Sequence, residues 1–359
     1  MAEPARIGLS ISTRINAPAD TLPTYRGFVL AMETVAGASD LPTDVGWTLL
    51  DDHGDPDTSQ ALAEQVAADP TYVGIVGPMG STEAFANAPV FDRAGLLQVS
   101  PCASHPDLCN RGYRTFFRLV PNETVQGTEL ARIAKNHLNA DRAAIVHDAD
   151  AFGTSVADNF SAGYIDLGGK VVARESFQQG PDEYGDLAGA ISASNPQLVF
   201  FAVHGHEGVL VSGEIRDRGV AVPFLGTDGL KTSFFLGGGD PGAEAFHTHS
   251  GADFSRMPTA AAFREEYVSR WPADSTYSPE AYDSAMMILE ALRRSDEPTR
   301  SGVFDSFKRL GDSGYTGITG TIRFGETGER LDAPVSFYRV EKAGDRRVMA
   351  YQGVTTDIG

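Results

Sequence analysis

The sequence contains little cysteine and no long apolar run. Two cysteines among 359 residues exclude a small scaffold held together by disulfides. Cys102 and Cys109 lie seven positions apart, a spacing that fits neither a metal site nor a redox C-x-x-C motif. They form either a bridge across one turn or two ordinary buried thiols. No segment approaches the length of an apolar membrane span.

Positive charge is also scarce. The chain has 29 Lys and Arg against 48 Asp and Glu, which gives a formal net charge of −19. Such a charge repels phosphate backbones and anionic lipid surfaces, and no cluster of Lys or Arg opposes it. We therefore expect neither a nucleic-acid partner nor a membrane-surface partner.

The first residues lack the apolar core of a signal peptide. Residues 1–4 lead directly into a strand-like segment at residues 6–12. The sequence alone leaves two alternatives, a cytosolic protein or a chain from which a leader has been trimmed.

What is present is an alternation of two patterns. With 42% hydrophobic and 21% charged residues, the chain can fill two globular domains. Apolar runs bounded by turns alternate with amphipathic stretches, which indicates the α/β class, with parallel sheets covered by helices on both faces. The first series has strands at 6–12, 46–52, 72–76 and 96–100 and helices at 24–36, 59–68, 82–94 and 105–110. The second has strands at 143–147, 170–176, 198–202 and 224–227 and helices at 152–167, 182–194 and 208–218.

Three segments are candidates for crossings between two domains. Residues 116–122 form an extended stretch between the two series. Beyond Gly251, helical patterns return at 260–271 and 278–294, followed by Gly-rich strands at 317–324 and 334–340. We therefore predict an N-terminal lobe of residues 1–119 and 252–325 and a C-terminal lobe of residues 120–251 and 326–359. Both would be Rossmann-like lobes, joined by a three-stranded hinge.

Two turns of the first series place small polar residues before a helix. These residues are Met79, Gly80 and Ser81 after one strand and Cys102, Ala103 and Ser104 after the next. Helix N-termini present free backbone N–H groups, and parallel strands end at one edge of the sheet, so the turns predict a socket for an anion. The hydroxyls of Ser81 and Ser104 would donate to a carboxylate. The simpler alternative is that Ser81 caps its helix.

The second series offers a counter-charge. Asp228 ends a strand and precedes a glycine, where it is either a turn residue or the partner of an ammonium group. Phe152 and His204 follow strands, and Tyr282 begins a long helix, so these three would line the same crevice. An anion socket opposed by an acid predicts an amino acid as the ligand.

The sequence gives little support for catalysis or for a bound metal or cofactor. No nucleophile with a base beside it occurs near the two turns, so we predict that the protein is not an enzyme, with an amide hydrolase as the opposing alternative. The pairs His204 and His206, and His247 and His249, have the alternate spacing of metal-binding strands, but no cysteine or carboxylate completes either set. We predict neither a metal nor a cofactor.

Several short motifs carry a family resemblance through their order and spacing. They are residues 75–82 (IVGPMGST), 100–108 (SPCASHPDL), 111–113 (RGY), 144–148 (AIVHD), 152–153 (FG), 224–229 (FLGTDG) and 280–283 (EAYD). Together they resemble the leucine/isoleucine/valine-type substrate-binding proteins of ABC importers, a branch of the type I periplasmic binding fold. The resemblance extends from Ile7 to about Val340.

This resemblance implies a two-lobed clamshell that closes on its ligand. By analogy with the family, Ser81 and Ser104 would hold the carboxylate of an amino acid. The carbonyl of Cys102 and the carboxylate of Asp228 would hold its ammonium group.

The side-chain pocket implied by the resemblance departs from the family. Phe152, His204 and Tyr282 would shape it, yet the family commonly has Tyr at the first position and frequently Tyr at the second. At Cys102 it often has Ala or Gly. Histidine at position 204 favours a polar, acidic or aromatic ligand over a branched aliphatic one, as a hypothesis.

The sequence therefore predicts an extracytoplasmic solute-binding protein, in the periplasm or at the cell surface, with or without a lipid anchor. We expect a monomer that delivers an amino acid or a related small carboxylate to the permease subunits of an ABC transporter. The alternative is a ligand-sensing domain of a regulator or receptor that uses the same clamshell.

Overall fold

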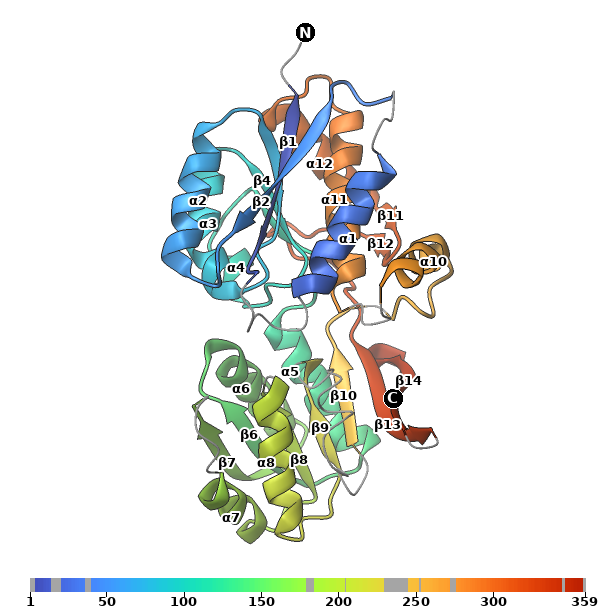
Figure 1. Ribbon diagram of the computed structural model, residues 1–359. Coiled ribbons are helices and arrows are strands. Elements are labelled where there is room, and N and C mark those ends of the chain that lie inside the picture. The colour runs from blue at the N-terminus through green and yellow to red at the C-terminus, as the bar shows by residue number, and fades with distance from the viewer. Residues whose placement is uncertain are drawn as a thin grey trace. The chain divides into compact units, whose positions relative to one another are not determined.

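The chain folds into two α/β units, shown in a computed structural model (Figure 1). The structure describes residues 4–13, 21–35, 40–178, 184–203, 205–228, 245–251, 253–271, 276–343 and 346–357. Unit 1 consists of Met1–Pro121 and Asp253–Ala333, and unit 2 consists of Asn122–Ala252 and Pro334–Gly359. Each unit is thus built from discontinuous segments, and the chain passes from one unit to the other three times.

Unit 1 contains a five-stranded parallel sheet with the strand order β2-β1-β3-β4-β5. Its strands are β1 (Ala5–Ile11), β2 (Val45–Asp51), β3 (Tyr72–Val76), β4 (Leu97–Ser100) and β5 (Phe116–Arg118). Its helices are α1 (Thr21–Thr34), α2 (Pro56–Ala68), α3 (Ser81–Arg93), α4 (Asp107–Asn110), α10 (Ala261–Arg270), α11 (Ser278–Arg293) and α12 (Arg300–Ser313). A small hairpin is formed by β11 (Tyr315–Gly317) and β12 (Gly320–Ile322).

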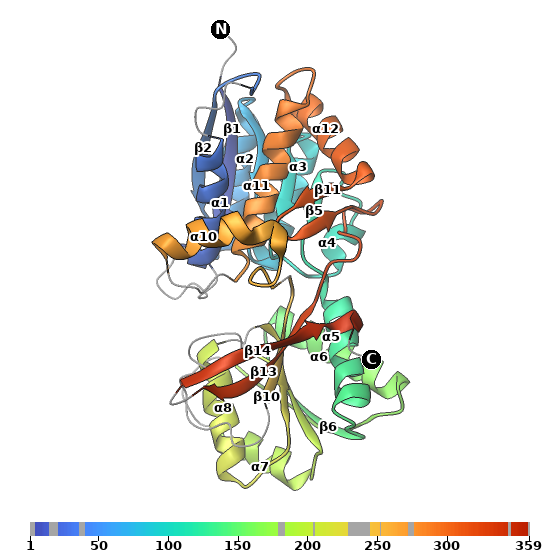
Figure 2. The same ribbon diagram turned by 90° about the vertical axis from the view of Figure 1, so that its right-hand side faces the viewer.

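Helices cover both faces of this sheet. Figures 1 and 2 show α1, α11 and α12 on one face and α2 and α3 on the other. The first face holds the larger core, which includes Ile7, Leu9, Phe28 and Ile288. Every residue of β3 is buried, as the near-continuous apolar runs of parallel strands require.

Unit 2 contains a seven-stranded sheet with the strand order β14-β13-β10-β9-β8-β6-β7. Its strands are β6 (Arg142–Asp148), β7 (Lys170–Phe177), β8 (Leu198–Ala202), β9 (Phe224–Gly226), β10 (Ala245–His249), β13 (Ser336–Ala343) and β14 (Arg346–Val354). Its helices are α5 (Glu123–Arg132), extended by a π-helical turn at Ile133–His137, α6 (Ala151–Asp166), α7 (Gly185–Ala193) and α8 (Gly205–Asp217). One apolar core joins α5 and α6 to the sheet, and another joins α7 and α8 to it.

The predicted α/β class with parallel-sheet cores is confirmed, although several elements differ from the expected ones. The helices α5 and α12 and the strand β14 were not expected. Residues 317–324, expected as one strand, belong to the hairpin of β11 and β12. The sheet of unit 2 is mixed, because β13 pairs antiparallel with both β10 and β14.

The unit boundary in the last third of the chain also differs from the expected one. Residues 326–333 were assigned to the C-terminal lobe, but the structure includes them in unit 1. Glu329 forms an ion pair with Arg118, and Arg330 donates hydrogen bonds to the carbonyls of Leu119 (3.4 Å) and Thr319 (2.8 Å). These polar contacts fasten the segment to unit 1 before the chain enters unit 2 at Pro334.

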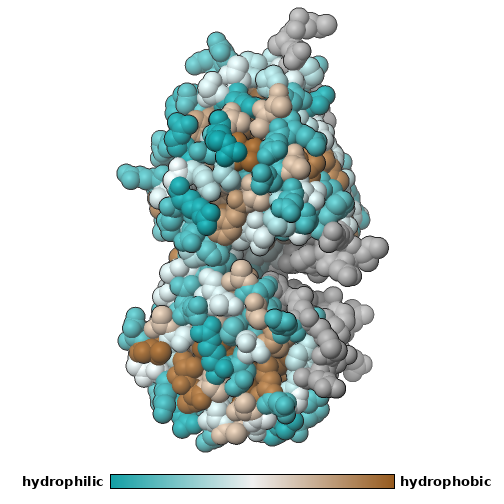
Figure 3. All heavy atoms as spheres, turned by 90° about the vertical axis from the view of Figure 1, so that its left-hand side faces the viewer, coloured by the Kyte–Doolittle hydropathy of each residue, from teal (hydrophilic) through white to brown (hydrophobic). Residues whose placement is uncertain are grey.

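The surface is mixed in character. Figure 3 shows one face, on which apolar residues lie as separate areas among hydrophilic ones. The large apolar side chains with the greatest exposure in the described ranges are Leu22, Trp47, Leu49, Val125, Ile165, Leu167, Val268, Leu331 and Val348. Among the helices of the described residues, none has both the length and the apolar character needed to cross a membrane.

Candidate functional site

Ser81 stands at the first position of α3 and does not cap it. The residue at the N-cap is Gly80, which has extended backbone angles and provides no side-chain cap. The Ser81 hydroxyl oxygen instead accepts a hydrogen bond from the backbone N–H of His105, at 3.2 Å. The interpretation of Ser81 as a helix cap is therefore wrong. Because a hydroxyl both accepts and donates, its hydrogen can be donated to a ligand.

Ser100, at the end of β4, holds the two predicted turns together. Its hydroxyl donates to the carbonyl oxygen of Pro78 at 2.9 Å. The same oxygen accepts from the backbone N–H groups of Ala103 at 2.9 Å and Cys102 at 3.3 Å. Those two N–H groups are directed inward to Ser100, so they are not the anion donors that the sequence suggested. Ser100 was missing from the predicted site, although a serine two and three residues before the N–H groups it binds is a known turn pattern.

The second helix N-terminus contributes less than expected. The helix predicted at residues 105–110 is the single turn α4, which begins at Asp107 and has Pro106 at its N-cap. Ser104 therefore lies three residues before the helix and does not cap it. It is buried, with 8% of its surface exposed. Two helix N-termini were expected side by side, but only the N-terminus of α3 lies at these turns.

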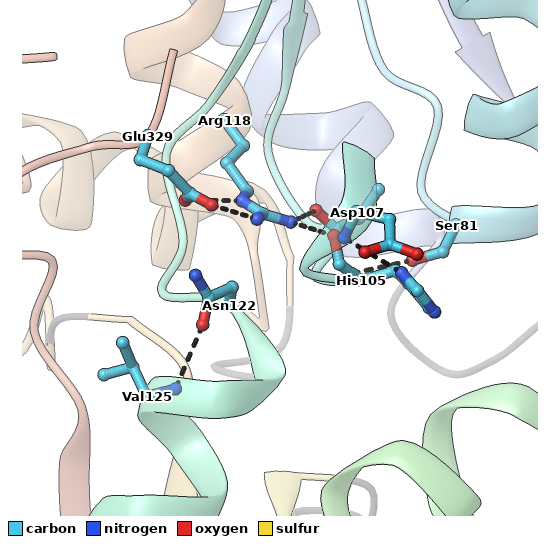
Figure 4. A network of polar contacts seen from close by, with 8 residues as sticks. Ser81, His105, Asp107, Arg118, Asn122, Val125 and Glu329 are labelled. Carbon is cyan, nitrogen blue, oxygen red and sulfur yellow. Dashed lines mark hydrogen bonds and ion pairs between the residues drawn. The ribbon is translucent and has the colours of Figure 1, made fainter. Parts of the chain in front are cut away.

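A buried arginine lies behind the second turn. Arg118, at the end of β5, has no exposed surface. Its guanidinium donates to the carbonyl oxygens of His105 at 2.7 Å and Ala103 at 3.3 Å, and it forms an ion pair with Glu329 in which Nε lies 2.7 Å from Oε2. Figure 4 shows this network running from Ser81 through His105 and Arg118 to Glu329. Neither Arg118 nor Glu329 was expected at the site from the sequence.

The ring of Phe85, in α3, contacts an aromatic group and a cationic group from the segment that follows β4. The ring of Phe85 lies 5.0 Å from that of His105, and the Arg111 guanidinium lies 4.3 Å from the centre of the Phe85 ring. Burial lowers the pKa of His105, and the nearby charges of Arg118 and Arg111 lower it further, against an opposing effect of Asp107. The imidazole is therefore neutral at neutral pH.

Two acids lie near the start of α3 and at the end of β2. Burial raises the pKa of Glu83, and the charges of Asp52 and Asp55 raise it further. Burial likewise raises the pKa of Asp52, against hydrogen bonds from Gly54 and Ser10. A Cβ at position 80 would collide with Oε2 of Glu83, so a larger residue there would require that carboxylate to move.

Met79 and Tyr282, also predicted for the site, are half-buried. Both pack against the main core of unit 1. Tyr282 lies in the second turn of α11, with its ring 5.0 Å from that of Phe263. Unit 1 thus gathers Met79, Gly80 and Ser81 on one strand-end turn, with Cys102, Ala103 and Ser104 on the neighbouring one.

In unit 2 the predicted residues lie at the carboxyl ends of strands. Phe152 is in the first turn of α6, just beyond β6, where Asp150 caps the helix by accepting from the N–H of Gly153 at 2.7 Å. Asp228 follows β9 and is half-buried. The strands β6 and β9 flank β8 in the sheet, so both residues lie at one edge of unit 2. His204 lies outside the described residues.

In the part of the chain that the structure describes, His247, His249 and the two cysteines show no metal-site geometry. His247 and His249 are buried in β10, and the His247 ring stacks on Tyr338 at 5.0 Å. Within the described ranges, no group of three or more His, Cys, Asp and Glu side chains is placed to hold a metal ion. Cys102 and Cys109 do not form a disulfide with each other, and of the two only Cys109 is buried. Burial raises the pKa of Cys109 to about 12.

Comparison with solved structures identifies the fold. A leucine binding protein from Thermotoga maritima superposes with a TM-score of 0.84 at 20% identity, over 98% of both chains. A solute binding protein from R. palustris, solved in complex with benzoate, reaches 0.81 at 15% identity, over 98% of this chain and 96% of the other. The predicted fold, that of type I periplasmic binding proteins, is thereby confirmed.

Sequence comparison then identifies the family. The profile described as "Periplasmic binding protein" matches residues 10–345, so the chain belongs to the periplasmic binding protein family. A curated relative, the Leu/Ile/Val-binding protein BraC3 of Rhizobium johnstonii, is 25% identical over 294 residues, which cover 82% of this chain and 79% of the relative. The resemblance to the leucine/isoleucine/valine-type proteins is confirmed.

Proposed function

We propose that this chain is the solute-binding protein of an ABC importer, and that it captures an amino acid or a related small carboxylate outside the cytoplasm. Membership of the periplasmic binding protein family supports this proposal. So does the relative named for binding leucine, isoleucine and valine. On this proposal the permease subunits of the transporter are its partners, and it acts as a monomer and not as an enzyme.

The observation that carries the proposal is the state of the Ser81 hydroxyl. Its oxygen accepts the N–H of His105, so its hydrogen is left to donate to an anion. It stands at the N-terminus of α3, a 13-residue helix whose N-cap has no side chain. The helix dipole at such an end favours a carboxylate, and hydrogen bonds to a charged group are stronger than neutral ones.

The remaining site residues follow from the family resemblance. We propose that Ser104 assists Ser81 at the carboxylate, and that the turns carrying Met79, Gly80 and Ala103 border this end of the ligand. The Cys102 carbonyl and Asp228 would bind the ammonium group. Phe152, His204 and Tyr282 would surround the ligand side chain. A ligand held by residues of both units would favour a closed arrangement of the two, with the three crossing segments as the hinge.

Calorimetric titration tests this function directly. The purified protein is titrated with the standard L-amino acids and with benzoate as a carboxylate that has no ammonium group. We expect at least one amino acid to bind, with polar, acidic or aromatic side chains preferred because of His204. Binding of only valine, leucine and isoleucine would contradict that preference. Absence of binding by every amino acid and by benzoate would contradict the proposed function itself.

A further inference from the structure

We propose that Arg118 is a positioning residue, which sets the backbone of the turn at residues 101–105 and connects that turn to the crossing segment that carries Glu329. The proposal rests on the proposed function, because it assigns a role in binding to groups that do not touch the ligand. Arg118, Glu329 and the turn at residues 101–105 all belong to unit 1.

The burial of Arg118 requires compensation. A guanidinium with no exposed surface is costly unless charge and hydrogen-bond partners replace water. Glu329 supplies the opposite charge through a two-point contact, and the carbonyl oxygens of Ala103 and His105 accept from Nη1. These carbonyls belong to alternate residues of the turn, so two of its peptide groups are oriented by one side chain.

His105 is the residue through which Arg118 reaches the site. Its backbone is held at both ends, since the N–H donates to Ser81 Oγ at 3.2 Å and the carbonyl accepts from Arg118 Nη1 at 2.7 Å. Figure 4 shows Arg118 and Ser81 on opposite sides of this residue. A displacement of the guanidinium would therefore move the backbone to which the Ser81 hydroxyl is bound, and with it the direction of the Ser81 O–H.

The same arginine lies where two crossing segments run side by side. The N–H of Arg118 donates to the carbonyl of Gly328 at 3.1 Å, and Arg118 and Glu329 form a parallel bridge. Arg330 adds a bond to the carbonyl of Leu119. One of these segments enters unit 2 after Pro121 and the other after Ala333. A shift in either crossing is thus transmitted through Arg118 to the turn.

Arg300 provides a matched control. Its guanidinium also binds backbone carbonyls of unit 1, at distances of 2.6–3.3 Å, and none of them belongs to the turn. They are the carbonyls of Val66, Ala67, Asp69, Tyr72 and Ala94. Replacing Arg300 should lower the stability of unit 1 without a specific effect on the turn.

The first test uses amide hydrogen exchange and needs no ligand. Exchange is measured for the N–H groups of Cys102, Ala103 and His105 in Arg118→Met, Arg118→Lys, Glu329→Gln and Arg300→Met. We expect Arg118→Met and Glu329→Gln to accelerate exchange at these groups by at least about tenfold beyond any change elsewhere in unit 1, with partial rescue in Arg118→Lys. Arg300→Met should not accelerate exchange at these N–H groups beyond any change elsewhere in unit 1.

Several results would overturn the proposal. The proposal is wrong if, in Glu329→Gln, the N–H groups of the turn exchange no faster than expected from the change elsewhere in unit 1. It is also wrong if Arg300→Met accelerates exchange at the turn beyond the change elsewhere in unit 1. If Arg118→Met does not fold, Glu329→Gln and Arg118→Lys decide the question, because both keep a polar partner in the buried space.

The second test measures coupling to the binding site. Affinities for L-leucine, L-phenylalanine and L-glutamate are measured in Ser81→Ala, Glu329→Gln and the double variant. Since both single changes release the same turn, we expect their combined effect to differ from the product of the single effects by at least about threefold. Independent effects would contradict the proposal. If the unaltered protein binds none of the three, the proposed function is in doubt, and the exchange experiment still decides the role of Arg118.

Discussion

A single hydroxyl, that of Ser81, has two roles in this account. It accepts the N–H of His105 and is free to donate its hydrogen to a carboxylate. Ser81→Ala removes both interactions, so we expect it to weaken amino-acid binding by roughly 1.5–3 kcal/mol, as measured by calorimetry. The matched control is Thr82→Ala, at the exposed next position of α3, where affinity should not change. Equal affinity in the two variants would show that Ser81 does not contact the ligand.

Asp228 is the residue on which the choice of an amino acid depends. Asp228→Ala would leave the ammonium group of a bound ligand without its counter-charge, so we expect a loss of at least about 2 kcal/mol in binding. Asp217→Ala, at the exposed end of α8, is the control and should bind as the unaltered protein does. An unchanged affinity in Asp228→Ala would remove this residue from the site.

At the residue scale, the sequence indicates the polar residues that follow strands, but it does not indicate the buried residues that hold the backbone of those turns in place. Ser81 and Asp228 could be selected because each follows a recognisable strand. Arg118 could not, since it follows two phenylalanines in an apolar segment, and hydropathy alone predicts no buried charge there. Its partner Glu329 is 211 positions away in the sequence. Such a pair becomes visible only when folding brings two distant segments together.

At the scale of elements, two helices escaped prediction because glycines interrupt their patterns. In α5, Gly127 lies against α6, where an added Cβ would come within 2.6 Å of the Asn159 Cβ. The glycine that weakens the helical pattern is therefore required by the packing of the two helices. In α12, Thr299 caps the helix by accepting from Gly302, and Val303, Phe307 and Leu310 form a buried stripe. Spacing and cap together were a usable signal for α12.

The antiparallel strands of unit 2 show a second limit of sequence patterns. Both β13 and β14 follow the last crossing and join a sheet whose other strands are parallel. A strand pattern specifies which side chains are buried but does not specify the direction of the neighbouring strand. Direction depends on where the chain returns from the other unit, which local sequence does not encode.

The first turn of α3 makes stability depend on pH. Because the pKa of Glu83 is raised above its ordinary value of 4.5, ionisation of this carboxyl costs more in the folded state than in the unfolded state. The contribution of Glu83 to the free energy of unfolding is therefore complete below pH 4.5, and it is lost as pH rises through the pKa that Glu83 has in the folded state. Glu83→Gln should increase the free energy of unfolding at pH 7, and the gain should vanish as pH falls below about 4.5.

Urea denaturation at pH 7 and below pH 4.5 measures this difference. The control is Glu64→Gln, at an exposed position of α2, which should leave the free energy of unfolding nearly unchanged at both. A Glu83→Gln variant that is less stable at pH 7 than the unaltered protein would contradict the assigned cost of ionisation.

At the scale of the whole molecule, we propose that the three crossings form a hinge on which the units move without either unfolding. Each unit has its own cores, and the chain passes between them at Pro121, between Gly251 and Asp253, and at Ala333. If a bound amino acid contacts both units, it should favour a closed arrangement. Small-angle X-ray scattering should therefore show a smaller radius of gyration at saturating ligand. Asp228→Ala should show no such decrease at the same ligand concentration, and an unchanged radius in the saturated, unaltered protein would contradict closure.

The central claim is that one ligand is held by both of its charged ends. Calorimetry with the amino acid that binds most tightly, its amide and its deaminated acid tests this claim most directly. The amide lacks the carboxylate proposed to bind Ser81, and the acid lacks the ammonium group proposed to bind Asp228. We predict that each analogue binds at least about 2 kcal/mol more weakly, a factor of roughly 30. An analogue that binds as tightly as the amino acid would contradict the claim.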